Sequence, residues 1–315
     1  MIFSLTTLPE KLAVIGAGPI GCELAQSFQR LGSQVYLIHK NPHILDREDS
    51  DAAAILQKKI SSEGVQLFLN SSVVQVEKKG FLKKIFLSVS GKEFQIDVDQ
   101  ILVGAGRVPN VEELGLENVN VHYDRVQGIS VNDYLQTTHP KIYAVGDVCM
   151  QWKFTHAADF AARIAIQNTL FFGRKKLSSL LMPWCTYTDP EIAHVGLYPV
   201  EAQKKGIEID TFVRPLNEVD RAVLDGESEG FVKIHVKKGT DKILGATLVS
   251  AHAGELISEI SVAMAAGMGL GKMANVIHPY PTQSEAIRQL GDIYNRTRLT
   301  STVKKFFKFW FEKII

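Results

Sequence analysis

The stretch "LAVIGAGPIGCELAQSF", residues 12–28, decides how the first part of the chain folds. Its apolar start is typical of a buried parallel strand, and "CELAQSFQRLG" is typical of a helix. Between them lie three glycines with GxGxxG spacing: the first permits a tight turn, the second lets the backbone approach a pyrophosphate, and the third lets helix and strand pack closely. The stretch predicts a dinucleotide site at the helix N-terminus, with a purely structural turn as the alternative. The loop residues expected at this site are Gly16, Gly18, Pro19, Ile20 and Gly21.

Basic residues follow the next strand-like run, "QVYLI" at residues 34–38. A site for NADH would carry Asp or Glu there, to accept a hydrogen bond from the ribose 2′-hydroxyl. This chain has His39 and Lys40 instead, with Arg47 nearby. Cations suit a 2′-phosphate, so the sequence favours NADPH, with NADH as the second choice. The alternative interpretation is that Lys40 and Arg47 are solvated surface charges.

The order of patterns along the chain predicts an α/β fold followed by a second domain. Helix and strand patterns alternate over the first hundred residues, which indicates a parallel sheet covered by helices. Residues 81–103 are rich in strand formers, a loop-rich segment runs to about residue 138, and "AADFAARIAIQNTLF" is helical. From about residue 180 the pattern changes to paired strands followed by a helix, which is α+β and indicates a separate domain.

Composition excludes several classes of protein. The 315 residues contain 35 Lys plus Arg and 34 Asp plus Glu, so the formal net charge of +1 is too small to draw the chain to nucleic acid or to an acidic membrane. Cys22, Cys149 and Cys185 are far apart in sequence, which argues against a disulfide scaffold and a local metal site. We find neither a signal peptide nor an apolar run of transmembrane length, and we expect a cytoplasmic protein that acts on small molecules.

Seven motifs together carry a family resemblance. They are "LPEKLAVIGAGPIGCELAQSF", "GAGRVPN", "IYAVGDV", "FTHAADFAARIAIQN", "TDPEIAHVG", "AHAGELISE" and "HPYPTQSEAI". In this order they resemble the pyridine nucleotide-disulfide oxidoreductases, most closely the mercuric reductase-like and dihydrolipoamide dehydrogenase-like flavoproteins. The resemblance implies a Rossmann-like NAD(P)H domain at 1–112, part of an FAD domain at 113–178, a dimerisation domain at 179–299 and a tail at 300–315.

The resemblance also implies roles for particular residues. Gly106 falls on the nicotinamide nucleotide motif, and Asp147 matches the carboxylate that accepts from the ribityl chain of FAD. Glu23 matches an acid near the nicotinamide and the flavin, where relatives pair it with a lysine that this chain lacks. The helix start that faces the flavin in the family corresponds to Thr155, His156 and Ala157.

The resemblance begins part-way through the family pattern. A complete member first has its own FAD-binding GxGxxG and a CxxxxC redox pair, so the chain resembles the C-terminal two thirds of an enzyme. A split gene, a truncated reading frame and a cloned fragment are all open as the reason, and we expect activity to require the N-terminal lobe that carries both features. The first hypothesis is therefore an NADPH- and FAD-dependent disulfide oxidoreductase, a homodimer whose substrate is a dithiol, a disulfide or a metal. The second is a dimeric NADPH-binding remnant without turnover. Because the chain ends "FEKII", without the vicinal cysteines of mercuric reductases, we do not expect mercury as the substrate.

"HPYPTQSE", residues 278–285, contains the candidate acid–base residues. In the family a His five residues before the Glu of this loop serves the thiol pair across the dimer interface. Counting back five from Glu285 gives Tyr280, as in mercuric reductases, and a phenol is a neutral donor and a poor base at pH 7. We expect Glu285 to bind or orient Tyr280. The alternatives are that His278 replaces the imidazole, or that the loop is only a proline-fixed turn.

The tail "VKKFFKFWFEKII" has a helical apolar face. Val303, Phe306, Phe307, Trp310 and Ile314 share that face, while Phe309 and Phe311 interrupt a clean division. Membrane-surface contact is one interpretation. We favour packing of the tail on its own dimer.

Overall fold

The computed structural model describes residues 2–314, which form two compact units. The first unit is discontinuous in sequence, and joins the residues up to Ala105 to those from Pro183 onward. The second unit is Gly106–Met182. These limits fall near the predicted boundaries at 112 and 178, and the assignment of a role to each domain stays a prediction.

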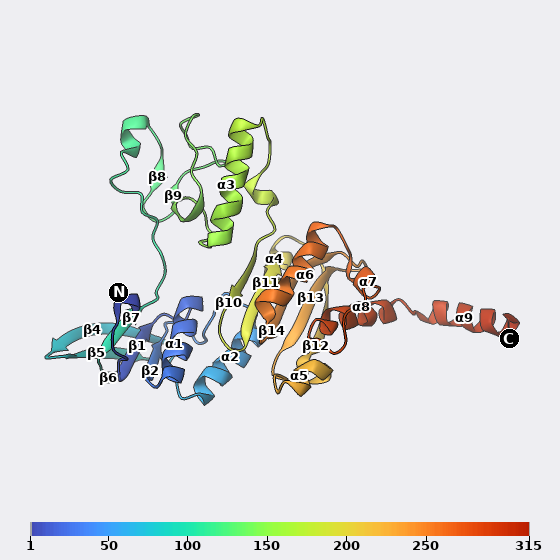
Figure 1. Ribbon diagram of the computed structural model, residues 1–315, viewed down its shortest axis with the longest axis horizontal. Coiled ribbons are helices and arrows are strands. Elements are labelled where there is room, and N and C mark those ends of the chain that lie inside the picture. The colour runs from blue at the N-terminus through green and yellow to red at the C-terminus, as the bar shows by residue number, and fades with distance from the viewer. Residues whose placement is uncertain (1, 315) are drawn as a thin grey trace. The chain divides into compact units, whose positions relative to one another are not determined.

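The first unit begins with a short 3₁₀ turn, η1 (Ile2–Ser4), and a parallel sheet with strand order β3-β2-β1-β7 (Figure 1). The sheet and its helices confirm the predicted strand–turn–helix–strand order; their bounds are β1 (Lys11–Ile15), α1 (Pro19–Leu31), β2 (Gln34–Ile38), α2 (Ser50–Ser62), β3 (Gln66–Phe68) and β7 (Gln100–Val103). Gly32 ends α1 in the left-handed region, at φ 110°. Asp49 caps α2, because its side chain accepts from the N–H groups of Asp51 and Ala52. Because the four strands run parallel, they all end at the edge of the sheet where the glycine-rich turn follows β1.

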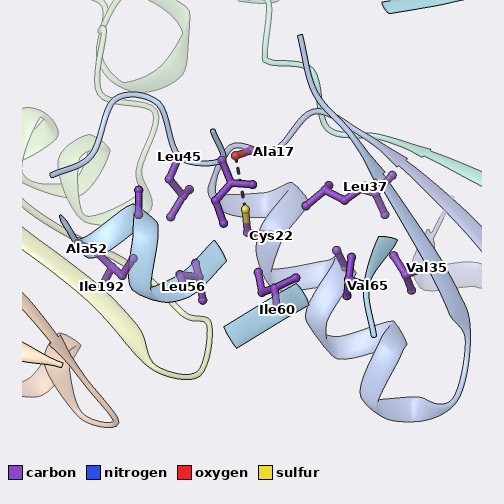
Figure 2. Close-up of a cluster of buried hydrophobic side chains, with 14 of the residues drawn as sticks. Ala17, Cys22, Val35, Leu37, Leu45, Ala52, Leu56, Ile60, Val65 and Ile192 are labelled. Atoms are coloured by element: carbon purple, nitrogen blue, oxygen red, sulfur yellow. Dashed lines mark hydrogen bonds between the residues drawn. The ribbon is translucent and has the colours of Figure 1, made fainter. Parts of the chain in front are cut away.

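The core of this part lies between the sheet and its two helices. Figure 2 shows side chains of β2, α1 and α2 gathered in one cluster, with Ile192 from the second part of the chain among them. Phe231 and Val249 belong to the same cluster. The cluster therefore connects residues on either side of the second unit in sequence.

An antiparallel three-stranded sheet follows β3 in the chain. Its strands are β4 (Ser71–Lys79), β5 (Leu82–Val89) and β6 (Lys92–Val98), so the strand-rich region begins ten residues before the predicted start at 81. Ile85, Leu87 and Val98 pack against Ala13 and Tyr36 of the parallel sheet. The charged residues of β4 and β6 explain the weak sequence signal, because these strands have largely exposed side chains.

A five-stranded antiparallel sheet follows the second unit, in the order β10-β11-β14-β13-β12. The helix α6 packs along β10, β11 and β14. The predicted α+β pattern is confirmed by this sheet and its helices: β10 (Pro183–Thr186), β11 (Glu191–Gly196), α4 (Pro199–Lys204), β12 (Ile209–Pro215), η5 (Leu216–Glu218), α5 (Asp220–Leu224), β13 (Phe231–Lys237), β14 (Ile243–Ser250), α6 (Ala253–Ala265), α7 (Leu270–Met273) and α8 (Glu285–Thr297).

One face of this sheet packs against the parallel-sheet part of the unit. Ile192, Val249 and Phe231 lie in register across three strands, and all three belong to the core cluster of α1 and α2. Two residues further along β13 on the same face, Lys233 binds Asp49 at 2.9 Å and Asp51 at 2.6 Å. The two parts of the first unit thus share both an apolar core and a buried ion pair.

The second unit consists mainly of loops and one long helix. Its elements are η2 (Leu116–Val119), β8 (Tyr123–Asp124), β9 (Gly128–Ile129), η3 (Gly146–Val148), α3 (Thr155–Leu170) and η4 (Leu177–Ser179). The apolar run at 142–148 ends in η3 instead of forming a strand. Ala157, Ala161 and Ile164 of α3 pack with Leu135 and Met150.

The last helix is α9 (Ser301–Ile314), which follows α8 at the end of the chain (Figure 1). None of its side chains, as far as Ile314, is buried. No helix within residues 2–314 is long and apolar enough to cross a membrane.

Candidate functional site

The glycine-rich turn between β1 and α1 is shaped by backbone packing. Gly16 has φ 103°, a left-handed conformation, and a Cβ there would lie 2.6 Å from the carbonyl oxygen of Gly104. A Cβ on Gly21 would lie 1.8 Å from the carbonyl oxygen of Gly16. Both positions therefore require glycine for the protein's own packing.

Gly18 differs from the other two glycines. It has an ordinary φ of −76°, and a Cβ there would meet nothing within 4 Å. Gly18 is also the N-cap of α1, where no side chain accepts from the first N–H groups of the helix. An open side of the backbone next to free helix N–H groups fits a phosphate group.

His39 binds the turn and carries no charge. Its Nδ1 accepts a hydrogen bond from the backbone N–H of Ala17 at 3.2 Å, and the ring is 9% exposed. Burial lowers the pKa of His39, with Asp46 raising it in part. His39 is therefore a neutral residue that positions the turn, which differs from the expectation of a cation at this place.

Lys40 and Arg47 are the cations that remain at this edge of the sheet. Both side chains are exposed, and within residues 2–314 neither forms a salt bridge to a carboxylate. Lys40 directly follows β2, at the carboxyl edge of the parallel sheet where the turn also lies. Both side chains are thus free to bind an anion.

Glu23 lies on α1, one turn beyond the glycine-rich loop. Its Oε1 accepts from the backbone N–H of Tyr187 at 2.8 Å. Burial raises the pKa of Glu23, and this hydrogen bond opposes the rise. On the same helix Gln26 exchanges hydrogen bonds with the backbone of Asp189. Glu23 therefore holds α1 against the loop between β10 and β11.

The second unit brings together most of the residues expected near a flavin. Asp147 is in η3, which packs against α3, the helix that begins at Thr155, His156 and Ala157. The N-cap of α3 is Phe154, whose side chain makes no capping hydrogen bond. This arrangement of a carboxylate beside a helix start fits one part of an FAD molecule. Gly106, also in this unit, has φ 126°, and a Cβ there would meet nothing within 4 Å.

Lys153 holds the loop between η3 and α3. Its Nζ donates to the carbonyl oxygen of Asp147 at 2.8 Å, and Arg107 donates to the carbonyl oxygen of Lys153 at 2.5 Å. Neither residue was singled out from the sequence. Their contacts are to backbone atoms, and backbone contacts leave no side-chain pattern in a sequence.

The "HPYPTQSE" loop separates its two candidate proton carriers. His278 lies between the carbonyl oxygen of Val276 and Oε1 of Glu259, 2.8 Å from its Nε2. The Tyr280 ring is 71% exposed, and its hydroxyl donates to Oδ2 of Asp220 at 2.9 Å. The hydrogen bond to Asp220 raises the pKa of Tyr280, which keeps the phenol protonated at neutral pH.

Glu285 does not bind Tyr280 in this structure, contrary to the expected pairing. It is the first residue of α8, is 9% exposed, and lies 3.4 Å from an Arg288 nitrogen. Asp220 could not be predicted as the partner of Tyr280, because the two residues are 60 positions apart in sequence.

The three thiols of the chain lie in surroundings that disfavour the thiolate. Cys22, Cys149 and Cys185 are all free. Burial raises the pKa of each, to about 11 for Cys149. A raised pKa suppresses the thiolate, the nucleophilic form. Within residues 2–314 we also find no group of three or more His, Cys, Asp or Glu residues that could hold a metal ion.

Comparison with protein families gives the context for this geometry. Residues 2–162 match the model described as "Pyridine nucleotide-disulphide oxidoreductase", and residues 182–290 match the dimerisation domain of the same family. The chain belongs to the pyridine nucleotide-disulphide oxidoreductases. The resemblance seen in the sequence is thereby confirmed, and the family uses FAD and NAD(P)H.

Two kinds of curated relative are similar to the chain. It is 34% identical over 284 residues to the mercuric reductase of Staphylococcus aureus, covering 90% of this chain and 52% of that enzyme. It is 36% identical over 291 residues to the dihydrolipoyl dehydrogenase of Thermus scotoductus, covering 92% of this chain and 63% of that enzyme. The chain thus spans about half to two thirds of the length of these relatives.

Solved structures show the same architecture. The HOCl-induced flavoprotein disulfide reductase RclA from Escherichia coli superposes with a TM-score of 0.85 at 27% identity, covering 92% of this chain and 66% of that one. LpdA from Mycobacterium tuberculosis gives a TM-score of 0.85 at 29% identity, covering 95% and 64%. The predicted fold class is confirmed by these matches.

Proposed function

We propose that this chain is the NADPH-binding and dimerisation part of an FAD-dependent disulfide oxidoreductase. The observation that carries the proposal is the turn at Gly18, with its open side and its uncapped helix start, at the edge of the sheet where Lys40 follows β2. In such an enzyme NADPH supplies a hydride, and FAD passes the electrons on to a disulfide. The residues of this chain bind the nucleotide and supply protons to the thiols.

The preference for NADPH rests on Lys40 and Arg47. Both are exposed and without a carboxylate partner among residues 2–314, and the neighbouring His39 is neutral, so they are the charges available for a 2′-phosphate. A charge-assisted hydrogen bond to the extra phosphate contributes on the order of 1–3 kcal/mol. NADPH should therefore bind about 5 to 150 times more tightly than NADH.

Equilibrium titration of the purified chain with each nucleotide tests this proposal. Replacing Lys40 by Glu should remove most of the preference, because the carboxylate repels the 2′-phosphate and accepts from a 2′-hydroxyl. Lys204→Glu, the same charge change on the exposed end of α4, is the control and should leave both dissociation constants unchanged. Equal affinity of the unmodified chain for NADPH and NADH would contradict the assignment of the preference, and no affinity for either would contradict nucleotide binding.

The loop at Tyr280 and Glu285 handles protons in this proposal. Tyr280 is exposed and protonated, so its hydroxyl is available as a donor to a thiolate, while Asp220 accepts from it in the isolated chain. The match to a dimerisation domain supports a homodimer, in which the loop of one subunit would serve a disulfide bound to the other. The substrate classes that fit are dithiols, disulfides and metal ions.

The disulfide in this proposal comes from a separate lobe that also carries most of the FAD site. The thiols of this chain have raised pKa values, and the sequence contains no CxxxxC pair. These same observations favour the second candidate function, a dimeric NADPH-binding protein without turnover. Adding a lobe with CxxxxC and bound FAD to the purified chain separates the two: NADPH-dependent reduction of a dithiol substrate supports the oxidoreductase, and its absence supports the binding protein.

A further inference from the structure

The helix α9 exposes a continuous aromatic surface. Its large apolar side chains are between 41% and 62% exposed; they are Phe306, Phe307, Phe309, Trp310, Phe311 and Ile314. Their recorded ring contacts are within α9: Phe306 stacks on Trp310 at 6.4 Å, and Phe307 on Phe311 at 5.9 Å. Within residues 2–314 no buried core cluster includes a residue of α9. The rings thus support one another while their outer faces remain in water.

The arrangement around the helix separates the apolar residues from all the charged residues except Lys313. At about 100° per residue, the apolar side chains occupy an arc of about 200° with Trp310 near its centre. Phe309 and Phe311, which interrupt the pattern in sequence, lie at the two edges of this arc. The opposite side carries Lys304, Lys305 and Lys308.

Positive charge borders the apolar arc on both sides. The helix has four lysines against one glutamate, Glu312, which lies 3.9 Å from Lys308. Lys304 and Lys305 lie just outside the two edges. Lys313, in the last turn, lies within the arc between Phe309 and Phe306, with its Nζ 4.5 Å from the ring centroid of Phe309. Lysines beside an apolar face can extend their ammonium groups to phosphate while their stems stay on the apolar surface.

We propose that α9 binds the surface of an anionic lipid bilayer, with its aromatic arc in the acyl boundary and its lysines at the phosphates. Aromatic rings that lie at an interface, together with lysines on the polar side, are the features of an interfacial helix. The length of α9 and its charges exclude a membrane-spanning role for this helix, in agreement with the absence of any spanning helix in residues 2–314.

A second copy of the chain fits this surface less well. A helical pair buries a narrow seam of two positions per heptad, whereas this arc is more than twice as wide and consists of bulky rings. Lysine is depleted at protein interfaces, and here it borders the arc. The dimerisation-domain match ends at residue 290, before α9 begins at Ser301. The structure thus favours lipid over the packing on its own dimer that the sequence suggested.

Co-sedimentation of the full chain with vesicles tests the proposal. The chain should bind vesicles of equal parts phosphatidylcholine and phosphatidylglycerol at least about tenfold more tightly than vesicles of phosphatidylcholine alone, since each basic residue near an anionic surface adds about 1 kcal/mol. Binding should weaken when NaCl is raised from about 0.1 M to about 1 M, which shortens the Debye length from about 10 Å to about 3 Å. Equal sedimentation with both vesicles would overturn the proposal.

Paired variants test the two sides of the helix separately. Phe306→Ser with Trp310→Ser should weaken binding at least about tenfold, because apolar burial contributes to interfacial affinity. Lys304→Glu with Lys308→Glu should abolish the preference for phosphatidylglycerol, whereas Lys92→Glu with Lys204→Glu, the same charge change on β6 and α4, should not. Unchanged thermal unfolding of all variants would confirm that the rest of the chain stays folded.

Two further measurements distinguish lipid from a second copy. The blue shift of tryptophan emission on adding the anionic vesicles should be absent in Trp310→Phe, although that variant still binds. Gel filtration should give the same oligomeric state for the unmodified chain and the Phe306→Ser, Trp310→Ser variant. If this variant loses a dimer while its vesicle binding is unchanged, α9 is a protein interface and the proposal is wrong.

Discussion

Gly18, the N-cap of α1, and Gly21, in its first turn, serve different purposes at the residue scale. A Cβ on Gly18 would enter open space, while a Cβ on Gly21 would lie 1.8 Å from a carbonyl oxygen. The fold therefore requires the second glycine, whereas nothing in the protein's own packing requires the first.

Alanine substitutions should separate these two requirements. Gly18→Ala should leave the free energy of unfolding within about 0.5 kcal/mol of the unmodified chain, because its φ of −76° suits alanine. The same change should weaken NADPH binding at least about tenfold, since the methyl group occupies the side where the backbone approaches the pyrophosphate. Gly21→Ala should instead lower the free energy of unfolding by more than about 2 kcal/mol. Calorimetric titration and thermal unfolding of both variants check this; full NADPH affinity in Gly18→Ala would place the nucleotide elsewhere.

The sequence identified the residues of this loop because each glycine has a local reason to be there. It did not identify the role of His39, whose ring nitrogen accepts from Ala17, because that contact joins residues 22 positions apart. The same limit applies to Tyr280 and Asp220. Spacing within one turn can be read from a pattern, whereas a hydrogen-bond partner depends on the packing of distant segments.

At the scale of elements, β13 is joined to the start of α2 by a buried ion pair. Lys233 and Asp49 each have a side-chain exposure of 8%, and Asp49 also caps α2. Lys233→Met should cost about 3 kcal/mol, because it leaves a buried carboxylate without its cation. Asp49→Asn is the matching single variant, because asparagine still caps α2 but carries no charge to pair with Lys233.

A double-mutant cycle tests whether the charges are coupled. The double variant Lys233→Met, Asp49→Asn should lose less stability than the sum of the two single variants by at least about 1 kcal/mol. Chemical denaturation of the four proteins gives this coupling. Additive losses would show that the two charges are not coupled, and would assign the effect of Lys233 to other contacts of its ammonium group, such as the Phe231 ring, whose centroid lies 4.6 Å from Nζ.

The loop before α8 is the element whose role depends most on the partner lobe. With a lobe that carries FAD and CxxxxC, Tyr280→Phe should slow substrate turnover about 10²-fold or more while flavin reduction by NADPH stays unchanged, because only the later step needs a proton donor. His278→Ala is the matched variant and should change turnover little. Both ring nitrogens of His278 are already engaged, one with the Val276 carbonyl oxygen and the other with Glu259, so we do not expect His278 to be the proton donor. Stopped-flow absorbance separates the two steps. If Tyr280→Phe leaves turnover unchanged and His278→Ala slows it, the proton donor is His278 and not Tyr280.

At the scale of the whole molecule, buried histidines make the stability depend on pH. Burial lowers the pKa of His194 to about 3 and of His235 to about 4, from about 6.5 in an unfolded chain. Below about pH 6.5 the unfolded chain binds protons that the folded chain does not, so the free energy of unfolding falls as the pH drops from about 6.5 to about 4. Each of these histidines contributes a slope of at most about 1.4 kcal/mol per pH unit.

His235→Gln should make this dependence less steep. The glutamine side chain can keep a hydrogen bond to Thr211, which His235 contacts at 2.9 Å, and it does not titrate. His122→Gln, at an exposed histidine, serves as the control. Denaturation at several values of pH between about 4 and about 8 measures the slopes. Identical slopes for His235→Gln and the unmodified chain would contradict the assignment of the lost stability to His235.

The first unit is completed only late in protein synthesis, because its two sequence segments are separated by the second unit. Asp49 and Lys233 are 184 residues apart, which a ribosome adding about 5–20 residues per second takes about 10 to 40 s to cover. Until residue 249 has been added, Ala52 and Leu56 of the nascent α2 lack one or more of the side chains of Ile192, Phe231 and Val249 that complete their cluster. The newly made N-terminal segment therefore presents an apolar surface to the cell for tens of seconds, long enough for a chaperone to hold it until β11, β13 and β14 emerge.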